Sequence, residues 1–235
     1  MLRSHNNTVR ELENPHMNPE LPTFAPFGRE KGAKVGKSDA VRGRPQASSR
    51  EMLQEAAFEL FLENSYAKTT VEQIANRAGV SRNTFFNYFA GKSDVFWVDL
   101  DVSLDLLNAA LAASESASVM GGIRSALLEV GRHFGPSRVP WALTQYALIG
   151  SVHELQASAI TRLTAHARLL DEFIVARAPL AGEAAARAAA YAVLGATIAA
   201  AQSWANAGTG RGEFEPYLAA ALSPVCEAFS RILEP

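Results

Sequence analysis

The stretch from Thr70 to Phe89, TVEQIANRAGVSRNTFFNYF, constrains the fold of this chain more than any other segment. Thr70 and Gln73 have the three-residue spacing of a capping box, which predicts the start of a helix. Gly79 can adopt the left-handed backbone conformation that ends a helix at little cost. Ser81 can then cap a second short helix. Two short helices around a tight turn have the outline of a helix-turn-helix.

The second of these helices has one apolar side and one side suited to DNA. Val80, Phe85 and Phe89 are expected to face a core, since Phe85 and Phe89 lie four residues apart. The opposite side carries residues that can contact bases, phosphates, sugars or a thymine methyl: Arg82, Asn83, Phe86 and Asn87. The alternative is an ordinary three-helix bundle. The serine cap followed by basic and amide side chains favours DNA binding.

The segment before the helices is basic and rich in proline. Residues 1–46 show no helical or strand periodicity, contain five prolines and are expected to be disordered. Between Arg29 and Arg50 there are seven basic and two acidic residues. The sequence Arg42-Gly43-Arg44-Pro45 resembles the AT-hook, in which an extended Arg-Gly-Arg lies in an A·T-rich minor groove. Arg42 and Arg44 are therefore candidates for minor-groove or phosphate contact, and a plain solvated linker is the alternative.

Residues 50–97 resemble the N-terminal domain of the TetR family of bacterial regulators. The matching segments are AAFELF at 56–61, TTV at 69–71, IA at 74–75, AGVS at 78–81, TFF at 84–86, YF at 88–89, and then Lys92 and Val95. The resemblance implies a dimer whose paired third helices enter successive major grooves of a palindromic double-stranded DNA operator.

The same resemblance implies contacts at named positions. Thr70 would contact a phosphate at the start of the second helix, and Tyr88 and Lys92 would hold the DNA backbone. The residues along the groove would be Ser81, Arg82, Asn83, Thr84 and Asn87. Phe86 departs from the family pattern, because the family often has a tyrosine there that bonds a phosphate, so no polar contact is expected.

The whole chain is predicted to be all-α. A disordered basic extension (1–46) precedes a three-helix DNA-binding domain (47–92), whose first helix runs from about Ser48 to Asn64, and then a helical ligand-binding and dimerisation domain (93–235). The second domain is expected to begin with one long helix that ends near Ala113. Its other helices are expected at 123–133, 141–150, 153–178, 182–207 and from 213 or 216 to 233.

A pocket for a small molecule is expected between the helices of the second domain. The candidate lining residues are Phe134, Trp141, Tyr146, His166, Leu170 and Phe173, with ordinary core packing as the alternative for each. The region of Trp97 and the leucine-rich linker after it are similar to the actinobacterial TetR branch that includes regulators of mycofactocin genes. This similarity implies an acyl-CoA-like effector, and a hydrophobic drug or aromatic metabolite is the alternative.

The alanine-rich helix at 182–207 is expected to pair with the last helix in a self-complementary four-helix dimer interface. An internal helix is the alternative. The weakly apolar run at 188–201 is shorter than a membrane span, so no membrane partner is expected. With one cysteine, Cys226, and no apolar N-terminal run, the chain is expected to be cytoplasmic.

The sequence does not favour an enzyme, and no cofactor or metal is expected. The spacing of His133, His153 and His166 is not that of metal ligands, and neither a phosphate loop nor a Gly-x-Ser-x-Gly motif is present. A cluster of Asp99, Asp101 and Asp105 is interpreted as solvated charge.

The sequence therefore predicts a ligand-responsive transcriptional regulator. We expect a repressor that a small hydrophobic or acyl-CoA-like effector releases from a palindromic operator. The alternative is a helical protein-interaction or nonspecific DNA-architectural protein without an effector, which would bind operator and random DNA alike.

Overall fold

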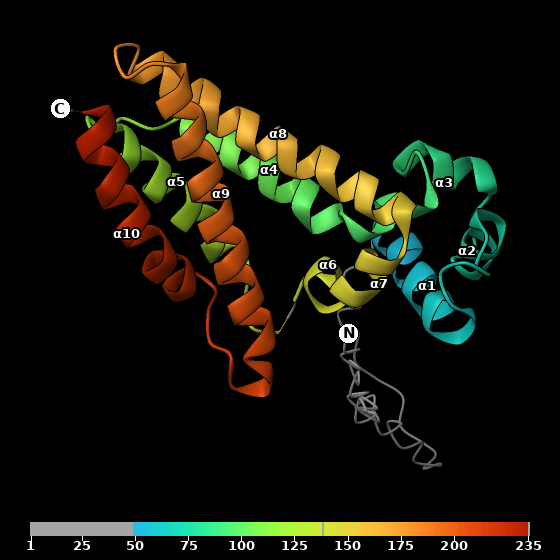
Figure 1. Cartoon of the computed structure of the whole chain (residues 1–235). Coiled ribbons are helices and arrows are strands. Elements are labelled where there is room, and N and C mark those ends of the chain that lie inside the picture. Colours follow the sequence, from blue (N-terminus) through green and yellow to red (C-terminus); the bar gives the residue numbers. More distant parts are fainter. Residues whose placement is uncertain (1–48, 138, 235) are drawn as a thin grey trace, which may run out of the picture. The chain divides into compact units, whose positions relative to one another are not determined.

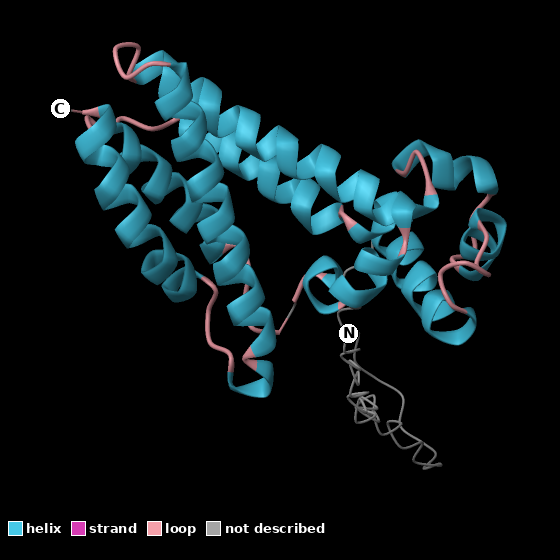
Figure 2. Ribbon diagram, viewed as in Figure 1, coloured by secondary structure: helices cyan, strands magenta, loops and turns pink. Residues whose placement is uncertain are grey.

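The computed structural model describes residues 49–137 and 139–234, and every regular element in these ranges is a helix (Figure 2). These residues belong to one compact unit. The predicted all-α fold is confirmed. The candidates Arg42 and Arg44, the extension at 1–46 and the expected helix start at Ser48 lie outside the described residues.

The N-terminal part consists of three helices and a 3₁₀ helix (Figure 1). They are α1 (Ser49–Asn64), α2 (Val71–Arg77), α3 (Arg82–Tyr88) and η1 (Lys92–Phe96).

The remaining helices form a bundle in which α4 and α8 run alongside each other and α5 lies against α10 (Figure 1). The elements are α4 (Val98–Ala112), α5 (Val119–Arg132), α6 (Trp141–Thr144), α7 (Tyr146–Ser151), α8 (His153–Arg177), α9 (Glu183–Asn206), η2 (Gly208–Gly210) and α10 (Glu215–Leu233).

The prediction of one long helix from residue 93 to Ala113 is wrong, because a break at Trp97 interrupts the helix. The 3₁₀ helix η1 ends at Phe96, Trp97 has φ −106° and ψ 5°, and α4 begins at Val98. The Asp94 carboxylate accepts the Gly91 amide at 2.8 Å, which closes the first turn of η1. The residues around the break are all buried, so their apolar pattern does not reveal it.

Two other helix boundaries also differ from the expected ones. Helix α5 begins at Val119 rather than 123, since the Ser118 hydroxyl caps it by accepting the Gly121 amide at 3.1 Å. The helix expected at 141–150 is divided at Gln145 into α6 and α7.

The core beneath α2 and α3 is completed by side chains from later in the chain. Phe61 and Phe96 stack with ring centroids 5.3 Å apart. Trp141 of α6 stacks on Phe58 of α1, with centroids 3.6 Å apart and planes at 6°. Leu155 of α8 is fully buried in the same cluster. The DNA-binding helices therefore share their core with η1, α6 and α8.

A second core fills the bundle around α5, α9 and α10. Its bulkiest fully buried side chain is Trp204, which donates its indole N–H to the Gly212 carbonyl at 2.9 Å. Gly131 allows α10 to approach closely, because an added Cβ would lie 2.6 Å from Leu218 Cδ1 and 3.4 Å from the Glu215 backbone.

Helix α9 keeps a face of small and apolar residues that the bundle does not cover. Ala188, Tyr191, Gly195 and Ala199 are exposed at intervals of three or four residues, so they lie on one side. Among the described residues, α9 is the one helix long and apolar enough to cross a membrane by length and composition. It is therefore longer than the apolar run recognised in the sequence.

Candidate nucleic-acid interface and cavity

Local hydrogen bonds fix the start and the end of α2 as predicted. The Thr70 hydroxyl accepts the Gln73 amide at 3.2 Å, and the Gln73 side chain accepts the Thr70 amide at 2.9 Å, which completes the capping box. Gly79 has φ +71°, and the Val80 amide donates to the Ala75 carbonyl at 2.9 Å. The left-handed conformation of Gly79 terminates α2 and directs the chain into α3.

Helix α3 has the two faces predicted from the sequence. The Ser81 hydroxyl accepts the Thr84 amide at 3.0 Å and so caps the helix. Phe85 and Phe89 are buried, and Val80 packs partly buried against the same core. The exposed residues of the helix are Arg82, Asn83, Phe86, Asn87 and Tyr88, while Thr84 is half-buried.

Phe86 supports Arg82 on the exposed face. The guanidinium carbon of Arg82 lies over the Phe86 ring, 4.9 Å from its centroid. The Phe86 ring rests edge-on against buried Phe85, with centroids 5.5 Å apart. Phe86 keeps 43% of its surface exposed. The departure from the family's tyrosine therefore leaves an apolar platform beneath a charged side chain.

Lys92 is held inside the protein rather than directed to solvent. Its ammonium donates to the Tyr66 carbonyl at 2.7 Å and the Thr69 carbonyl at 2.9 Å, and it lies 4.0 Å from the Tyr66 ring centroid. Burial lowers the pKa of Lys92, and the nearby Glu154 carboxylate opposes the shift. Lys92 thus fixes the loop that leads to the Thr70 cap, and its contact with phosphate stays a prediction.

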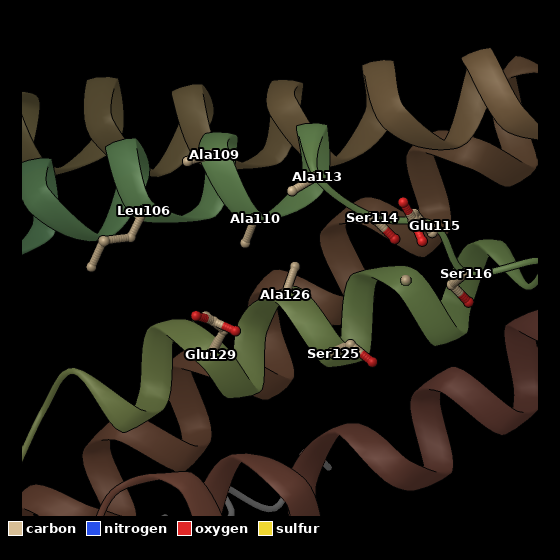
Figure 3. Close-up of a pocket in the computed structure, with 11 residues that line it drawn as sticks. Leu106, Ala109, Ala110, Ala113, Ser114, Glu115, Ser116, Ser125, Ala126 and Glu129 are labelled. Atoms are coloured by element: carbon tan, nitrogen blue, oxygen red, sulfur yellow. The ribbon is translucent and has the colours of Figure 1, made fainter.

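A cavity of about 500 Å³ lies between α4 and α5 (Figure 3). Leu106 and Ala110 on α4 face Ala126 on α5, and the connection between the helices closes one end (Figure 3). The described residues of the lining are Leu106, Ala109, Ala110, Ala113, Ser114, Glu115, Ser116, Gly122, Ser125, Ala126 and Glu129. The walls are mostly small side chains with a few hydroxyl groups and two carboxylates.

Five of the predicted ligand residues have described side chains, and none of these five is among the described residues that line this cavity. Trp141 stacks on Phe58, Leu170 is buried in the bundle core, and Phe134 packs partly buried against that core. Phe173 is half-buried and carries the Arg177 guanidinium over its ring at 4.8 Å. The side chain of Tyr146 lies outside what the structure describes. The contact of these residues with an effector stays a prediction.

His166 is buried in α8 and bonded on both sides. Nδ1 lies 2.9 Å from the Arg162 carbonyl, and because a carbonyl only accepts, Nδ1 carries a proton. Nε2 lies 3.1 Å from the Ser103 hydroxyl of α4. Burial lowers the pKa of His166, against the opposing effects of the Arg162 carbonyl and Asp101.

The interpretation of Asp101 as a solvated charge is wrong. Its carboxylate accepts the Arg162 Nε at 2.7 Å, and Arg162 also donates to Asp94 at 2.9 Å. Burial alone would lower the pKa of Arg162, but the bonds to Asp101 and Asp94 raise it overall. Sequence reasoning missed this group, since Arg162 lies more than 60 residues after both aspartates and forms no local motif with them.

Two family models match the chain. The model of bacterial regulatory proteins of the tetR family matches residues 53–96, which contain the helix-turn-helix and η1. The model of the MftR C-terminal domain matches residues 117–230, which contain α5 to most of α10.

Individual proteins resemble the chain in sequence or in fold. The mycofactocin biosynthesis transcriptional regulator MftR of Mycobacterium tuberculosis is 27% identical over 136 residues, covering 57% of this chain and 68% of that protein. The SmeT–triclosan complex has a TM-score of 0.54 at 18% identity, covering 77% of this chain and 90% of SmeT, a repressor from Stenotrophomonas maltophilia. FadR of Bacillus subtilis in complex with stearoyl-CoA has a TM-score of 0.50 at 19% identity, covering 76% of this chain and 96% of FadR. The two structures share the fold. With the exposed face of α3 and both family models in agreement, the chain is a DNA-binding transcriptional regulator that belongs to the TetR family.

Proposed function

We propose that this regulator is a cytoplasmic repressor that binds a palindromic operator as a homodimer and releases it when a small effector binds. The observation that carries the proposal is the exposed face of α3. Arg82, Asn83 and Asn87 project from a helix whose other side is anchored by buried Phe85. These side chains can donate to base edges and phosphates.

The residues around this face have supporting roles in the proposal. Thr70 stands exposed at the start of α2, where a helix N-terminus favours a phosphate. Tyr88 is 45% exposed and offers a hydroxyl to the DNA backbone. Ser81 and Thr84 lie at the start of α3, where they border the groove.

The uncovered face of α9 supports the homodimer. Its small residues let a second helix approach closely, and Tyr191 supplies apolar area for a self-complementary contact. Helix α10 lies beside α9 and presents Ala220, Pro224 and Ala228 on its own exposed side. Two copies joined through α9 and α10 would make a four-helix interface.

The cavity between α4 and α5 is the proposed effector site. Its volume lies in the range of small-molecule pockets. SmeT holds triclosan and FadR holds stearoyl-CoA, so a small hydrophobic molecule and an acyl-CoA-like molecule are the two effector classes proposed.

Helix α4 connects the cavity to the DNA-binding helices. Leu106 and Ala110 line the cavity, and the same helix begins directly after Trp97 and η1. In the DNA-binding state the two α3 helices of the dimer would lie one DNA turn apart, roughly 34 Å. An effector that binds better to a state with another separation would shift the population away from DNA.

Operator binding tests the function directly. Fluorescence anisotropy at moderate salt would compare promoter DNA of the protein's own and neighbouring genes with random DNA of equal length. We expect preferential binding of one promoter and a loss of about tenfold in affinity for Arg82→Ala, the scale of one good base contact. Equal affinity for promoter and random DNA after salt correction would favour the nonspecific architectural alternative.

Effector release is tested with stearoyl-CoA and triclosan as probes. Ala110→Phe fills the cavity and should abolish the response of the operator complex to the active probe. Ala112→Phe, on an exposed position of the same helix, is the matched control. If a probe releases the Ala110→Phe variant from the operator as readily as it releases wild type, the effector binds elsewhere.

A further inference from the structure

The 3₁₀ helix η1 contacts each of the neighbouring parts of the molecule. Lys92 bonds the carbonyls of the loop before α2, and the Val95 carbonyl accepts the Gln54 side chain of α1 at 3.0 Å. Phe96 packs among the rings of α1 and α6. Asp94 bonds both the Gly91 amide and Arg162 of α8. A change in the orientation of η1 therefore reaches α1, α2 and α3 together.

Arg162 ties together the two sides of the break at Trp97. Asp94 precedes the break and lies 2.9 Å from Arg162 Nη2, while Asp101 follows it and lies 2.7 Å from Nε. The guanidinium also lies over the Trp97 ring, 5.9 Å from its centroid. One rigid, planar guanidinium group thus spans the junction between η1 and α4.

The ion pair between Arg162 and Asp94 is only partly solvated. The side chains of Arg162 and Asp94 are 18% and 20% exposed. Water screens such pairs less than it screens surface pairs, and removal of one partner leaves a charge that is poorly compensated. Arg162 also donates to the Ser158 hydroxyl of its own helix at 2.6 Å, which fixes its orientation.

Asp94 links Arg162 to the C-terminal end of α3, the helix proposed to contact the bases. One carboxylate oxygen accepts Arg162, and the other accepts the Gly91 amide at 2.8 Å. Gly91 lies three residues after Tyr88, where α3 ends. Two consecutive charged hydrogen bonds therefore connect α8 to the exit of α3.

We propose that Arg162 is a positioning residue for DNA binding, which braces η1 against α4 and so sets the angle of α3 in the dimer. The inference rests on the proposed function and adds a named regulatory contact to it. A movement of α4 or α8 that separates Arg162 from Asp94 frees η1, and with it α3. Arg162 itself does not touch DNA in this mechanism.

The test compares Arg162→Gln with Arg168→Gln. Arg168 lies on the same helix, is 74% exposed in its side chain and pairs across the surface with Glu172. Each full-length protein would select sites from a random DNA library, followed by affinity measurement on the wild-type operator. We expect wild type and Arg168→Gln to select one half-site spacing. Arg162→Gln should accept spacings one base pair longer or shorter and bind the wild-type operator about tenfold more weakly, a coupling of ordinary allosteric size.

The width of the distribution of selected half-site spacings distinguishes a positioning role of Arg162 from a simple loss of stability. A destabilised protein has a smaller active fraction, but its folded molecules keep a single spacing. Asp94→Asn should widen the distribution as Arg162→Gln does, while Asp105→Asn, an exposed position on α4, should not. If Arg162→Gln selects the wild-type spacing with wild-type affinity, the proposal is overturned.

Amide hydrogen exchange provides a readout without DNA. The Gly91 amide and the residues of α3 should exchange faster in Arg162→Gln than in wild type. Unchanged exchange at Gly91 would contradict the proposal that Arg162 holds η1 in place. If wild type selects no sequence at all, the proposed function fails, and the exchange experiment still decides whether Arg162 holds Gly91.

Discussion

The guanidinium of Arg82 lies over the ring of Phe86, one turn further along the exposed face of α3, at 4.9 Å from the ring centroid. A long charged side chain on a surface helix normally samples many rotamers, and ordering it on DNA costs conformational entropy. A cation–π contact reduces that cost because it holds Arg82 close to the helix before DNA arrives. We therefore expect Phe86 to compensate in part for the tyrosine hydroxyl that this position lacks.

Phe86→Leu should weaken operator binding by about twofold to fivefold, because an exposed cation–π contact is worth roughly 0.5–1 kcal/mol and the leucine has no ring to provide it. Phe86→Tyr should bind at least as tightly as wild type, since it keeps the ring and adds a phosphate donor. Anisotropy with the selected operator measures both. Leu62→Ala, which removes an exposed apolar side chain on α1, is the control. If Phe86→Leu binds the operator with wild-type affinity, the Phe86 ring does not support Arg82 for DNA binding.

The turn between α2 and α3 depends on the left-handed conformation of Gly79. Its φ is +71°, and nothing lies within 4 Å of the position where a Cβ would stand. Gly79→Ala should therefore destabilise the protein through backbone strain alone, by about 1 kcal/mol. Gly79→Asn should cost less, because asparagine adopts this conformation more readily. Urea denaturation followed by circular dichroism compares the two variants, and equal stabilities for alanine and asparagine would argue against strain.

Local chemistry explains why the helix-turn-helix could be predicted from sequence. The Thr70 capping box, the turn at Gly79 and the Ser81 cap each involve residues within a few positions of one another. The break at Trp97 could not be predicted in this way, because buried residues on both sides of it continue an apolar pattern. The salt bridges of Arg162 depend on the tertiary packing of α8 against η1 and α4.

The cavity shows a different limit of sequence reasoning. Aromatic and large apolar residues were expected to line a pocket, but such residues also fill space: Trp141 stacks on Phe58, and Leu170 lies in the bundle core. The cavity instead exists where Ala110 and Ala126 leave space between two helices. Their small side chains do not indicate a pocket in the sequence, because the space between them depends on how α4 packs against α5.

The buried imidazole of His166 makes stability depend on pH. Burial lowers the pKa of His166 in the folded chain, whereas the unfolded histidine titrates near its ordinary value of about 6.5. As pH falls below that value the unfolded chain takes up the proton first, so the free energy of unfolding decreases towards the folded pKa. The stabilisation is fully present above about pH 6.5.

His166→Gln should flatten the part of the stability profile between about pH 7 and 5, because glutamine keeps hydrogen-bonding groups but does not titrate. His153→Gln, an exposed histidine at the start of the same helix, should leave the profile unchanged. Thermal unfolding at a series of pH values measures both. A profile for His166→Gln parallel to that of wild type would show that other groups cause the dependence.

Tyr191 lies at the middle of the uncovered face of α9 and keeps 55% of its surface exposed in the single chain. In the proposed dimer this side chain is buried against the partner, where a carboxylate would lose its hydration without gaining a partner. Tyr191→Asp should therefore give a monomer in size-exclusion chromatography with light scattering. Operator affinity should fall by about a hundredfold, because the two reading helices no longer bind together.

Leu180→Asp is the matched control for this prediction. Leu180 is fully exposed in the turn between α8 and α9 and lies before the first residue of the helix that carries Tyr191. The same change of charge there should leave both the mass in solution and the operator affinity unchanged. If Tyr191→Asp stays dimeric at micromolar concentration with wild-type affinity, the dimer does not form through this face. The exposed small residues of α9 would then require another partner.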